Sequence, residues 1–253
     1  MNINSLIKSD INYTNEKNVY HFISSEVERP QWSINLDNYF KKNPNHLQIK
    51  RQYKFHSNNI GTDTQKKKFF QYITELGGVT VDLASGPSGY FSPVFDFLKD
   101  DSIFIATDAC PKIINAHQKA NTDNRFYIFD VDLDKVLPFN DGSIDAFSGN
   151  LLDNVDNYRG LLKEVGRCLK SNGRFAVIEL FYETGSQTCD YLKQRNAVYS
   201  SLEYFISVCS ENGLKYKDSE IRRKIVGRIS KGDLLPIGED DKCLETIVYF
   251  EKI

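Results

Sequence analysis

The hydrophobic pattern of the chain becomes regular near residue 62 and then alternates between the periods of helices and strands. Thr62 or Asp63 can cap a first helix, which Gly77 and Gly78 then end. Further helices are predicted over residues 90–98, from residue 111 onward, and over 158–169 and 190–212. Short apolar runs predict buried strands at residues 79–83, 103–106, 126–129, 144–148 and 175–180, followed by two adjoining strands at 216–229 and 244–251.

This alternation predicts an α/β fold, in which a mostly parallel sheet is covered by helices on both faces. The last two predicted strands have no helix between them, so we expect an antiparallel hairpin at the sheet edge. In open sheets of this kind, ligands bind beyond the carboxyl ends of the strands. The functional residues should therefore lie just after each strand.

The first 61 residues have a different texture. They are rich in asparagine, lysine and aromatic residues, contain Pro30 and Pro44, and show no clear period. Residues 1–68 hold 11 basic and 6 acidic side chains, a balance of +5, which leaves −7 for the remainder of a chain with net charge −2. We interpret residues 1–61 as an N-terminal helical and loop cover over the substrate, and 62–253 as the main domain.

Composition excludes several classes of protein. The net charge of −2 argues against general binding of polyanions, and no apolar run approaches the roughly 20 residues of a membrane span. The first ten residues contain no apolar signal-peptide segment. The five cysteines are odd in number, scattered and without a C-x-x-C pair, which argues against a disulfide framework or a structural zinc site. A cytoplasmic setting is expected.

The turn after the first strand of the main domain is the strongest chemical feature. Small residues at Ala84, Gly86 and Gly89, around Pro87, would let a ligand approach the backbone closely. In dinucleotide-binding proteins such a turn cradles a pyrophosphate. Here Asp82 stands at the strand end, and its carboxylate would repel a pyrophosphate but suits an ammonium group. An amino-acid moiety fits this turn better.

Acidic residues also follow the next two strands. Asp108 lies 22 residues after Gly86 and can accept hydrogen bonds from both hydroxyls of an unphosphorylated ribose. Asp130 can accept from an adenine amino group, while the Val131 N–H donates to a ring nitrogen. Asp132 is a rival to Asp130 for the adenine, because the stretch from residue 130 to residue 138 is long.

These motifs, in this order and spacing, resemble the class I S-adenosylmethionine-dependent methyltransferases. The resemblance covers about residues 79–180 and implies a Rossmann-like seven-stranded sheet with an antiparallel edge strand. It is carried by Asp82-x-Ala84-x-Gly86, Asp108, Asp130, Leu137-Pro138-Phe139, Asp141-Gly142-Ser143-Ile144-Asp145 and Leu162-x-Glu164-Val165-x-Arg167-x-Leu169-Lys170-x-x-Gly173-Arg174.

The sequence departs from the family pattern at three places. Ala84 replaces the usual first glycine and Ser88 a later one, with Gly89 shifted by one position. The stretch from residue 130 to 138 is longer than in the family. Alanine and serine remain small, so these changes are compatible with the same loop.

The resemblance implies S-adenosylmethionine as cofactor and places residues 150–155 opposite its methyl group. No carboxylate cluster suggests a metal, and the paired histidines of some related enzymes are absent. We predict catalytic or substrate-orienting roles for Asp153, Tyr182 and Glu183. The predicted cofactor-binding residues are Asp82, Ala84, Gly86, Pro87, Gly89, Asp108, Ala109, Asp130, Val131 and Asn150.

The acceptor is predicted less sharply than the cofactor. Aromatic residues in the N-terminal cover and in the helix from about residue 190 suit a small-molecule or natural-product acceptor, methylated at oxygen or nitrogen. The alternatives are an RNA or peptide substrate, bound through the basic N-terminus and the strip at residues 222–228, and a non-catalytic module that kept the fold. An NAD-dependent oxidoreductase is disfavoured by Asp82. The oligomeric state is left open.

Overall fold

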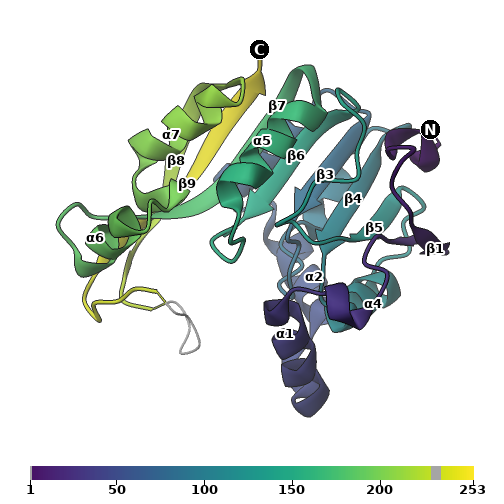
Figure 1. The fold of residues 1–253 in the computed structure, drawn as a ribbon, viewed down its shortest axis with the longest axis horizontal. Helices are drawn as coiled ribbons and strands as arrows, with labels where there is room; N and C mark the ends of the chain where they lie inside the picture. The colour runs from purple at the N-terminus through teal and green to yellow at the C-terminus, as the bar shows by residue number, and fades with distance from the viewer. Residues whose placement is uncertain (1, 229–234) are drawn as a thin grey trace.

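The computed structural model of the chain describes residues 2–228 and 235–253 and contains one mixed sheet. The strand order is β1-β2-β5-β4-β3-β6-β7-β9-β8, and the strands run side by side across the molecule (Figure 1). The strands are β1 Thr14–Glu16, β2 Val19–His21, β3 Val79–Leu83, β4 Ile103–Asp108, β5 Phe126–Asp130, β6 Ile144–Asn150, β7 Leu169–Tyr182, β8 Leu214–Val226 and β9 Lys242–Lys252.

The α-helices are α1 Gln31–Lys42, α2 Ile49–Asn59, α3 Thr64–Thr74, α4 Pro111–Ala120, α5 Tyr158–Cys168, α6 Gln187–Gln194 and α7 Leu202–Glu211. Short 3₁₀ helices are η1 Ile3–Leu6, η2 Glu26–Glu28, η3 Pro44–His46, η4 Ser92–Asp96 and η5 Val198–Ser200. Helices α5 and α7 lie on one face of the sheet (Figure 1). Helix α3, together with η4 and α4, contributes to the core on the other face.

The predicted fold class is confirmed. Strands β5, β4, β3, β6 and β7 are parallel, and β9 pairs antiparallel with both β7 and β8. Strand β9, which is antiparallel to both of its neighbours, is not at the edge, however. It is inserted between β7 and β8, because the closing hairpin folds back so that β8, the earlier of its strands, lies outermost.

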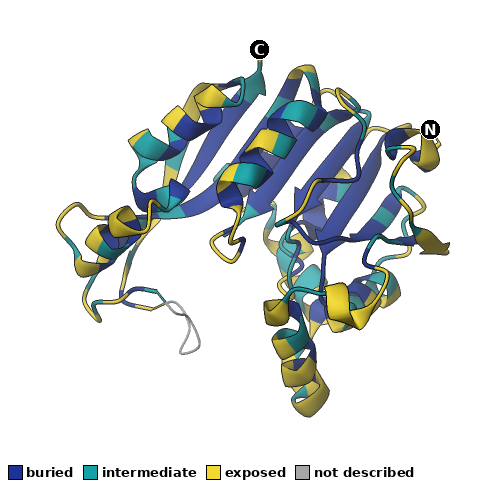
Figure 2. Ribbon diagram, in the orientation of Figure 1, coloured by how far each residue is buried: buried dark blue, intermediate teal, exposed yellow. Residues whose placement is uncertain are grey.

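Two hydrophobic cores sandwich the sheet. Phe147, Phe175 and Phe205 belong to the core under α5 and α7, whereas Phe69 and Phe104 belong to the opposite core. All five are at most 2 % exposed. The central strands β3 and β4 are buried along their whole length (Figure 2), as expected for a parallel sheet covered on both faces.

The N-terminal segment contributes to the sheet, which the prediction of helices and loops for residues 1–61 missed. The hairpin β1–β2 adds two strands at the edge of β5, with β2 parallel to β5, so the sheet has nine strands instead of seven. Three-residue strands are too short to produce a readable alternation in the sequence. The remaining part of the segment forms α1 and α2, which contact α4.

Two predicted helices differ from the observed elements. Residues 90–98 form only the 3₁₀ helix η4, with Pro93 in its first turn. The long helix predicted over 190–212 is broken into α6, η5 and α7, because Asn196 adopts a left-handed backbone with φ 51°. Ser201 then caps α7 by accepting a hydrogen bond from the Tyr204 N–H.

The other boundaries are close to the prediction. Asp63 caps α3 by accepting from the Lys66 N–H, and Pro111 begins α4. The predicted end of the penultimate strand at residue 229 lies outside the described residues. All five cysteines are buried and free. Among the helices that the structure describes, none is both long and apolar enough to cross a membrane.

A close backbone contact between α5 and the end of α7 yields a stability prediction. A Cβ placed on Gly166 would lie 2.3 Å from the backbone oxygen of Asn212, whereas one on Gly61 would have no heavy atom within 4 Å. Gly166→Ala should therefore lower the free energy of unfolding by about 1–3 kcal/mol through overpacking. Gly61→Ala, the matched control, should change it by less than about 0.5 kcal/mol. Chemical denaturation would check both, and equal stability of the two variants would contradict the packing described here.

Candidate functional site

The loop after β3 is held against β4 by a set of short hydrogen bonds. Ala84 and Gly86 adopt left-handed backbone angles, with φ 49° and 59°. The Ser85 N–H donates to the Thr107 carbonyl at 2.8 Å, and the Ala84 N–H donates to the Thr107 hydroxyl at 3.2 Å. That hydroxyl donates in turn to the Asp82 carbonyl at 2.9 Å. These contacts hold an alanine in a conformation that ordinarily favours glycine.

A buried histidine supports the loop from behind. His117 Nε2 lies 2.8 Å from the Gly86 carbonyl oxygen, and Nδ1 lies 2.9 Å from the Tyr53 hydroxyl. Burial lowers the pKa of His117 to about 4, so the neutral ring donates from Nε2 and accepts at Nδ1. Gly89 packs against Tyr53, whose ring would lie 2.6 Å from an added Cβ.

The contact between His117 and Gly86 joins residues 31 positions apart, and no sequence pattern connects them. His117 is 1 % exposed and touches the loop directly, because α4 packs beside α2.

Asp82 is the acid at the end of β3. It is 8 % exposed, and its carboxylate accepts from the hydroxyls of Ser148 at 2.7 Å and Ser85 at 2.8 Å. Burial raises the pKa of Asp82 to about 6, against the lowering effect of these two hydrogen bonds. No cation is paired with Asp82 among the ion pairs of the described residues. A buried carboxyl of this kind suits a cationic partner.

Asp108, at the end of β4, joins this loop to the next helix. One carboxylate oxygen accepts from the Gly86 N–H at 3.0 Å, and the other accepts from the Cys110 N–H at 2.7 Å. Burial raises the pKa of Asp108 to about 6. Each oxygen has a second lone pair, so the carboxylate can still accept from a ligand hydroxyl.

The residues around the loop fit the amino-acid and ribose parts of S-adenosylmethionine. A Cβ on Gly86 would have only the Ala84 carbonyl nearby, at 3.6 Å, so the backbone is open to a ligand. Gly86 and Asn150 are partly exposed, and Pro87 is exposed. An acid therefore stands on each of two neighbouring strand ends beside an open backbone turn.

At the strand end of β5, the two residues predicted to contact adenine have partners within the chain. Asp130 is fully buried, and both its carboxylate oxygens accept from the Arg29 guanidinium at 2.7 Å, while His21 Nδ1 lies 2.9 Å from one of them. The Val131 N–H, expected to meet an adenine nitrogen, donates to the Asp108 carbonyl at 3.1 Å. Parallel pairing continues one residue further than expected and uses this donor.

Asp132 is the nearby rival carboxylate. It is 7 % exposed, and one oxygen accepts from the Asp134 N–H at 3.1 Å, while Lys135 Nζ lies 3.7 Å from the other. Arg29 was not singled out in the sequence. It lies 101 residues from Asp130, and nothing in the spacing of charges connects the two.

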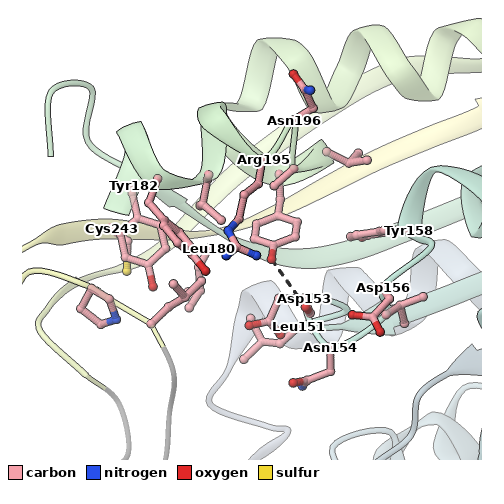
Figure 3. A pocket seen from close by; sticks show the side chains of 18 of the residues that line it. Leu151, Asp153, Asn154, Asp156, Tyr158, Leu180, Tyr182, Arg195, Asn196 and Cys243 are labelled. Atoms are coloured by element: carbon pink, nitrogen blue, oxygen red, sulfur yellow. Dashed lines mark hydrogen bonds between the residues drawn. The ribbon is translucent and has the colours of Figure 1, made fainter. Parts of the chain in front are cut away.

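A second part of the site is a cavity of about 690 Å³ beyond the ends of β6 and β7 (Figure 3). The loop after β6 and the segment from α6 to η5 form most of its wall, and among the described residues none of the predicted N-terminal cover lines it. Its lining includes Leu151, Asp153, Asn154, Tyr158, Leu180, Tyr182, Tyr191, Arg195, Tyr199 and Cys243.

Two of the three predicted catalytic residues, Asp153 and Tyr182, line this cavity. Glu183 does not. Its side chain is exposed beyond the end of β7, and its N–H donates to the Lys242 carbonyl at 2.9 Å. Glu183 follows the last residue of β7 and lies outside the cavity lining, so its predicted role stays a prediction without support from this cavity.

Glu179 anchors the loop after β6, which lines the cavity. This residue of β7 is 1 % exposed, and one carboxyl oxygen accepts from the Tyr158 hydroxyl at 2.6 Å and from the Leu152 N–H at 3.1 Å. Burial raises the pKa of Glu179 to about 8. Asp153 therefore directly follows Leu152, whose backbone N–H is held by the Glu179 carboxyl group.

Arg195 brings positive charge into the cavity wall. Its guanidinium lies over the Tyr191 ring, 4.5 Å from the centroid, and has no carboxylate partner among the described residues. The neighbouring Tyr199 hydroxyl donates to the Asp153 carbonyl at 3.5 Å (Figure 3). Within residues 2–228 and 235–253, no group of three or more potential ligand side chains is placed to hold a metal ion.

Comparisons with known proteins agree with this geometry. Residues 81–177 match the family model described as a methyltransferase domain. No curated protein sequence matches the chain.

Several solved structures share the fold. Geranyl diphosphate C-methyltransferase from Streptomyces coelicolor A3(2) is 13% identical, with 75% of this chain and 77% of that chain covered and a TM-score of 0.54. The YcgJ protein from Bacillus subtilis is 16% identical, with coverage of 74% and 96% and a TM-score of 0.55. The MccD protein is 16% identical, with coverage of 76% and 98% and a TM-score of 0.57.

The family match includes the turn after β3, Asp108, Asp130 and the strands as far as β7. It therefore covers the same part of the chain in which the acids and the open backbone turn come together. The solved structures share the fold over about three quarters of this chain. Residues 81–177 therefore form a methyltransferase domain of the class I S-adenosylmethionine-dependent type.

Proposed function

We propose that this methyltransferase acts on an oxygen or nitrogen of a small-molecule or natural-product acceptor, bound in the cavity beyond β6 and β7. The position of that cavity carries the proposal. It begins at Leu151, directly after the predicted cofactor residue Asn150, so an acceptor there borders the cofactor loop. Its volume of about 690 Å³ lies within the range of small-molecule sites.

In this proposal the chain's own residues bind and orient the cofactor. Asp82 pairs with the ammonium group, Asp108 accepts from the ribose hydroxyls, and the backbone at Ala84, Gly86 and Pro87 lies against the amino-acid tail. The cofactor itself supplies a methyl group activated by its sulfonium. The protein then mainly aligns the acceptor and excludes water.

The adenine end is assigned to the strand end of β5, between Ala109 and the carboxylates of Asp130 and Asp132. Asp130 is the better placed of the two if Arg29 releases it. It ends β5 opposite Asp108 of β4, at the same edge of the sheet as Asp82 of β3. Asp132 takes the adenine if Arg29 stays.

On the acceptor side, Asp153 and Tyr182 are proposed to orient the nucleophile, and Asp153 can take its proton. Arg195 favours an acceptor with an acidic group, since its guanidinium lies in the wall without a carboxylate partner among the described residues. The Streptomyces enzyme of similar fold acts on geranyl diphosphate, also a small molecule, as its name states.

An RNA substrate has less support. Arg222 pairs with Asp63 at 2.8 Å, and Arg223 pairs with Glu245 at 2.8 Å, so two cations of the predicted basic strip are neutralised within the chain. A polyanion would have to displace these partners. The small-molecule proposal needs no such rearrangement.

Calorimetric titration with S-adenosylhomocysteine and then with NAD tests the cofactor assignment first. Transfer of radiolabelled methyl from the cofactor to a panel of hydroxylated and aminated aromatic acids, beside their neutral amides, tests the acceptor. We expect label in the acids. Label transferred only to RNA or peptides would overturn the small-molecule proposal, and binding of NAD alone would overturn the cofactor assignment.

Loss of the ribose acid should weaken cofactor binding. Asp108→Ala should reduce the affinity for S-adenosylhomocysteine by about 1–3 kcal/mol, because charge-assisted hydrogen bonds are lost. Calorimetry measures this, with thermal melts to show that the variant folds. Asp123→Ala, which removes an acid at the opposite end of β5, is the control and should bind normally. An unchanged affinity in folded Asp108→Ala would refute the ribose assignment.

Cofactor affinity should depend on pH near 6. The pKa values of Asp82 and Asp108, each raised by burial to about 6, leave these carboxyls increasingly protonated below that pH. Because the pKa of each carboxyl is higher in the folded state than in the unfolded chain, protonation at low pH stabilises the folded, cofactor-free protein. This contribution to the free energy of unfolding is lost as the pH rises through 6. Binding of an ammonium group needs the ionised form, so affinity should fall from pH 7 to pH 5, by up to about tenfold per pH unit for each proton.

Titrations with S-adenosylhomocysteine across this pH range would measure the effect. Ser148→Ala removes a hydrogen bond that lowers the pKa of Asp82, so the midpoint should move to higher pH. A flat profile in both proteins would contradict the role given to Asp82.

Arg195 should affect the acceptor without affecting the cofactor. Once an acidic acceptor is found in the panel, Arg195→Ala should raise its KM by about tenfold or more, whereas Arg195→Lys should retain part of the binding. Affinity for S-adenosylhomocysteine should stay the same. If wild type and Arg195→Ala had the same KM for the acid, Arg195 would not bind the acidic group of the acceptor.

A further inference from the structure

A segment of the N-terminal region crosses the end of the site where the adenine is expected. Residues 21–33, called the strap here, run from the last residue of β2 to the first turn of α1 and include η2. At the start of the strap, the Phe22 N–H donates to the Asp130 carbonyl at 3.0 Å. The strap thus begins on the same strand end that supplies the predicted adenine residue.

Polar contacts hold the middle and the end of the strap. Arg29 donates to both carboxylate oxygens of Asp130 at 2.7 Å and also to the Ala109 carbonyl at 2.6 Å. The Ser33 hydroxyl donates to the same Ala109 carbonyl at 2.5 Å. The strap is therefore bound to the ends of both β4 and β5.

These contacts leave the site open at one end and covered at the other. Ala109 is 1 % exposed and Asp130 fully buried, whereas Gly86 is partly exposed and Pro87 exposed. The amino-acid and ribose parts of the cofactor could reach their residues. An adenine could not touch the Asp130 carboxylate while the strap lies over it.

A buried carboxylate needs a partner, and removal of one partner without replacement is costly. Arg29 and an adenine amino group are both hydrogen-bond donors for Asp130. His21 stays beside the carboxylate at 2.9 Å in the covered arrangement. Exchange of one donor for the other would keep Asp130 hydrogen-bonded in both states, with a neutral donor in place of the charged one.

We propose that the strap gates the adenine end of the cofactor site, and that Arg29 must leave Asp130 before the cofactor is fully bound. This inference rests on the proposed placement of the cofactor. Opening of the strap costs free energy, which reduces the fraction of the free protein that can bind the cofactor. The apparent affinity is therefore lower than that of a protein with the strap already open.

The chain contains a natural reporter of this movement. Trp32 is its single tryptophan, lies within the strap and is 36 % exposed. Opening of the strap changes the surroundings of this ring. Tryptophan emission therefore follows the strap, and calorimetry independently follows the binding of S-adenosylhomocysteine.

The test uses Arg29→Gln, which removes the bidentate ion pair but keeps a polar side chain. We expect S-adenosylhomocysteine to bind about three to ten times more tightly, with a faster association rate and a smaller change in Trp32 emission than in wild type. Ser33→Ala removes only the hydrogen bond to Ala109 and should change affinity in the same direction, by less. It also serves if Arg29→Gln does not fold.

Arg125→Gln is the matched control, because Arg125 forms a similar pair with Asp123, at 2.7 Å, beside the opposite end of β5. It should leave the affinity unchanged. The gating proposal would be wrong if folded Arg29→Gln and Ser33→Ala bound the ligand as tightly as wild type or more weakly. It would also be wrong if wild-type Trp32 emission did not respond to the ligand, and Arg29 would then be a static part of the site. Failure of wild type and all variants to bind S-adenosylhomocysteine would instead overturn the cofactor placement itself.

Discussion

The site depends on the burial of two carboxylates on neighbouring parallel strands. The pairing of β3 with β4 places Asp82 opposite Ala106, two residues before Asp108, so both acids reach the same sheet end. Neither is neutralised by a cation among the described residues; both are held by hydroxyl or backbone donors. These hydrogen bonds stabilise the left-handed backbone of the loop between the two acids. In the free protein, both carboxyl groups remain without a cationic partner among the described residues.

Local rules were enough to predict the central sheet and the loop. Residues 79–83 form a strand with the predicted bounds because a short apolar run between a glycine pair and a small-residue turn allows little else. The helix capped by Asp63 follows the same logic. Asp82, Gly86 and Asp108 came together because each directly follows or ends a parallel strand, and such ends meet at one edge.

Contacts between distant segments could not be predicted in this way. The pair of Arg29 with Asp130 joins residues 101 positions apart, and the bond of His117 to Gly86 depends on how α4 packs. The break at Asn196 is equally hidden, since the apolar period on either side reads as one helix. In each case tertiary structure decides between options that sequence patterns leave equal.

The two outer strands of the sheet have a consequence for how the protein behaves in a crowded solution. Strand β1 is only three exposed polar residues long, while β8 is rich in lysine, arginine and acidic residues and has irregular pairing at Tyr216–Asp218 and Ile221–Arg223. Short length, charge and bulges each discourage a second sheet from adding its own strand. The molecule therefore extends its sheet to nine strands without offering either border as a template for aggregation.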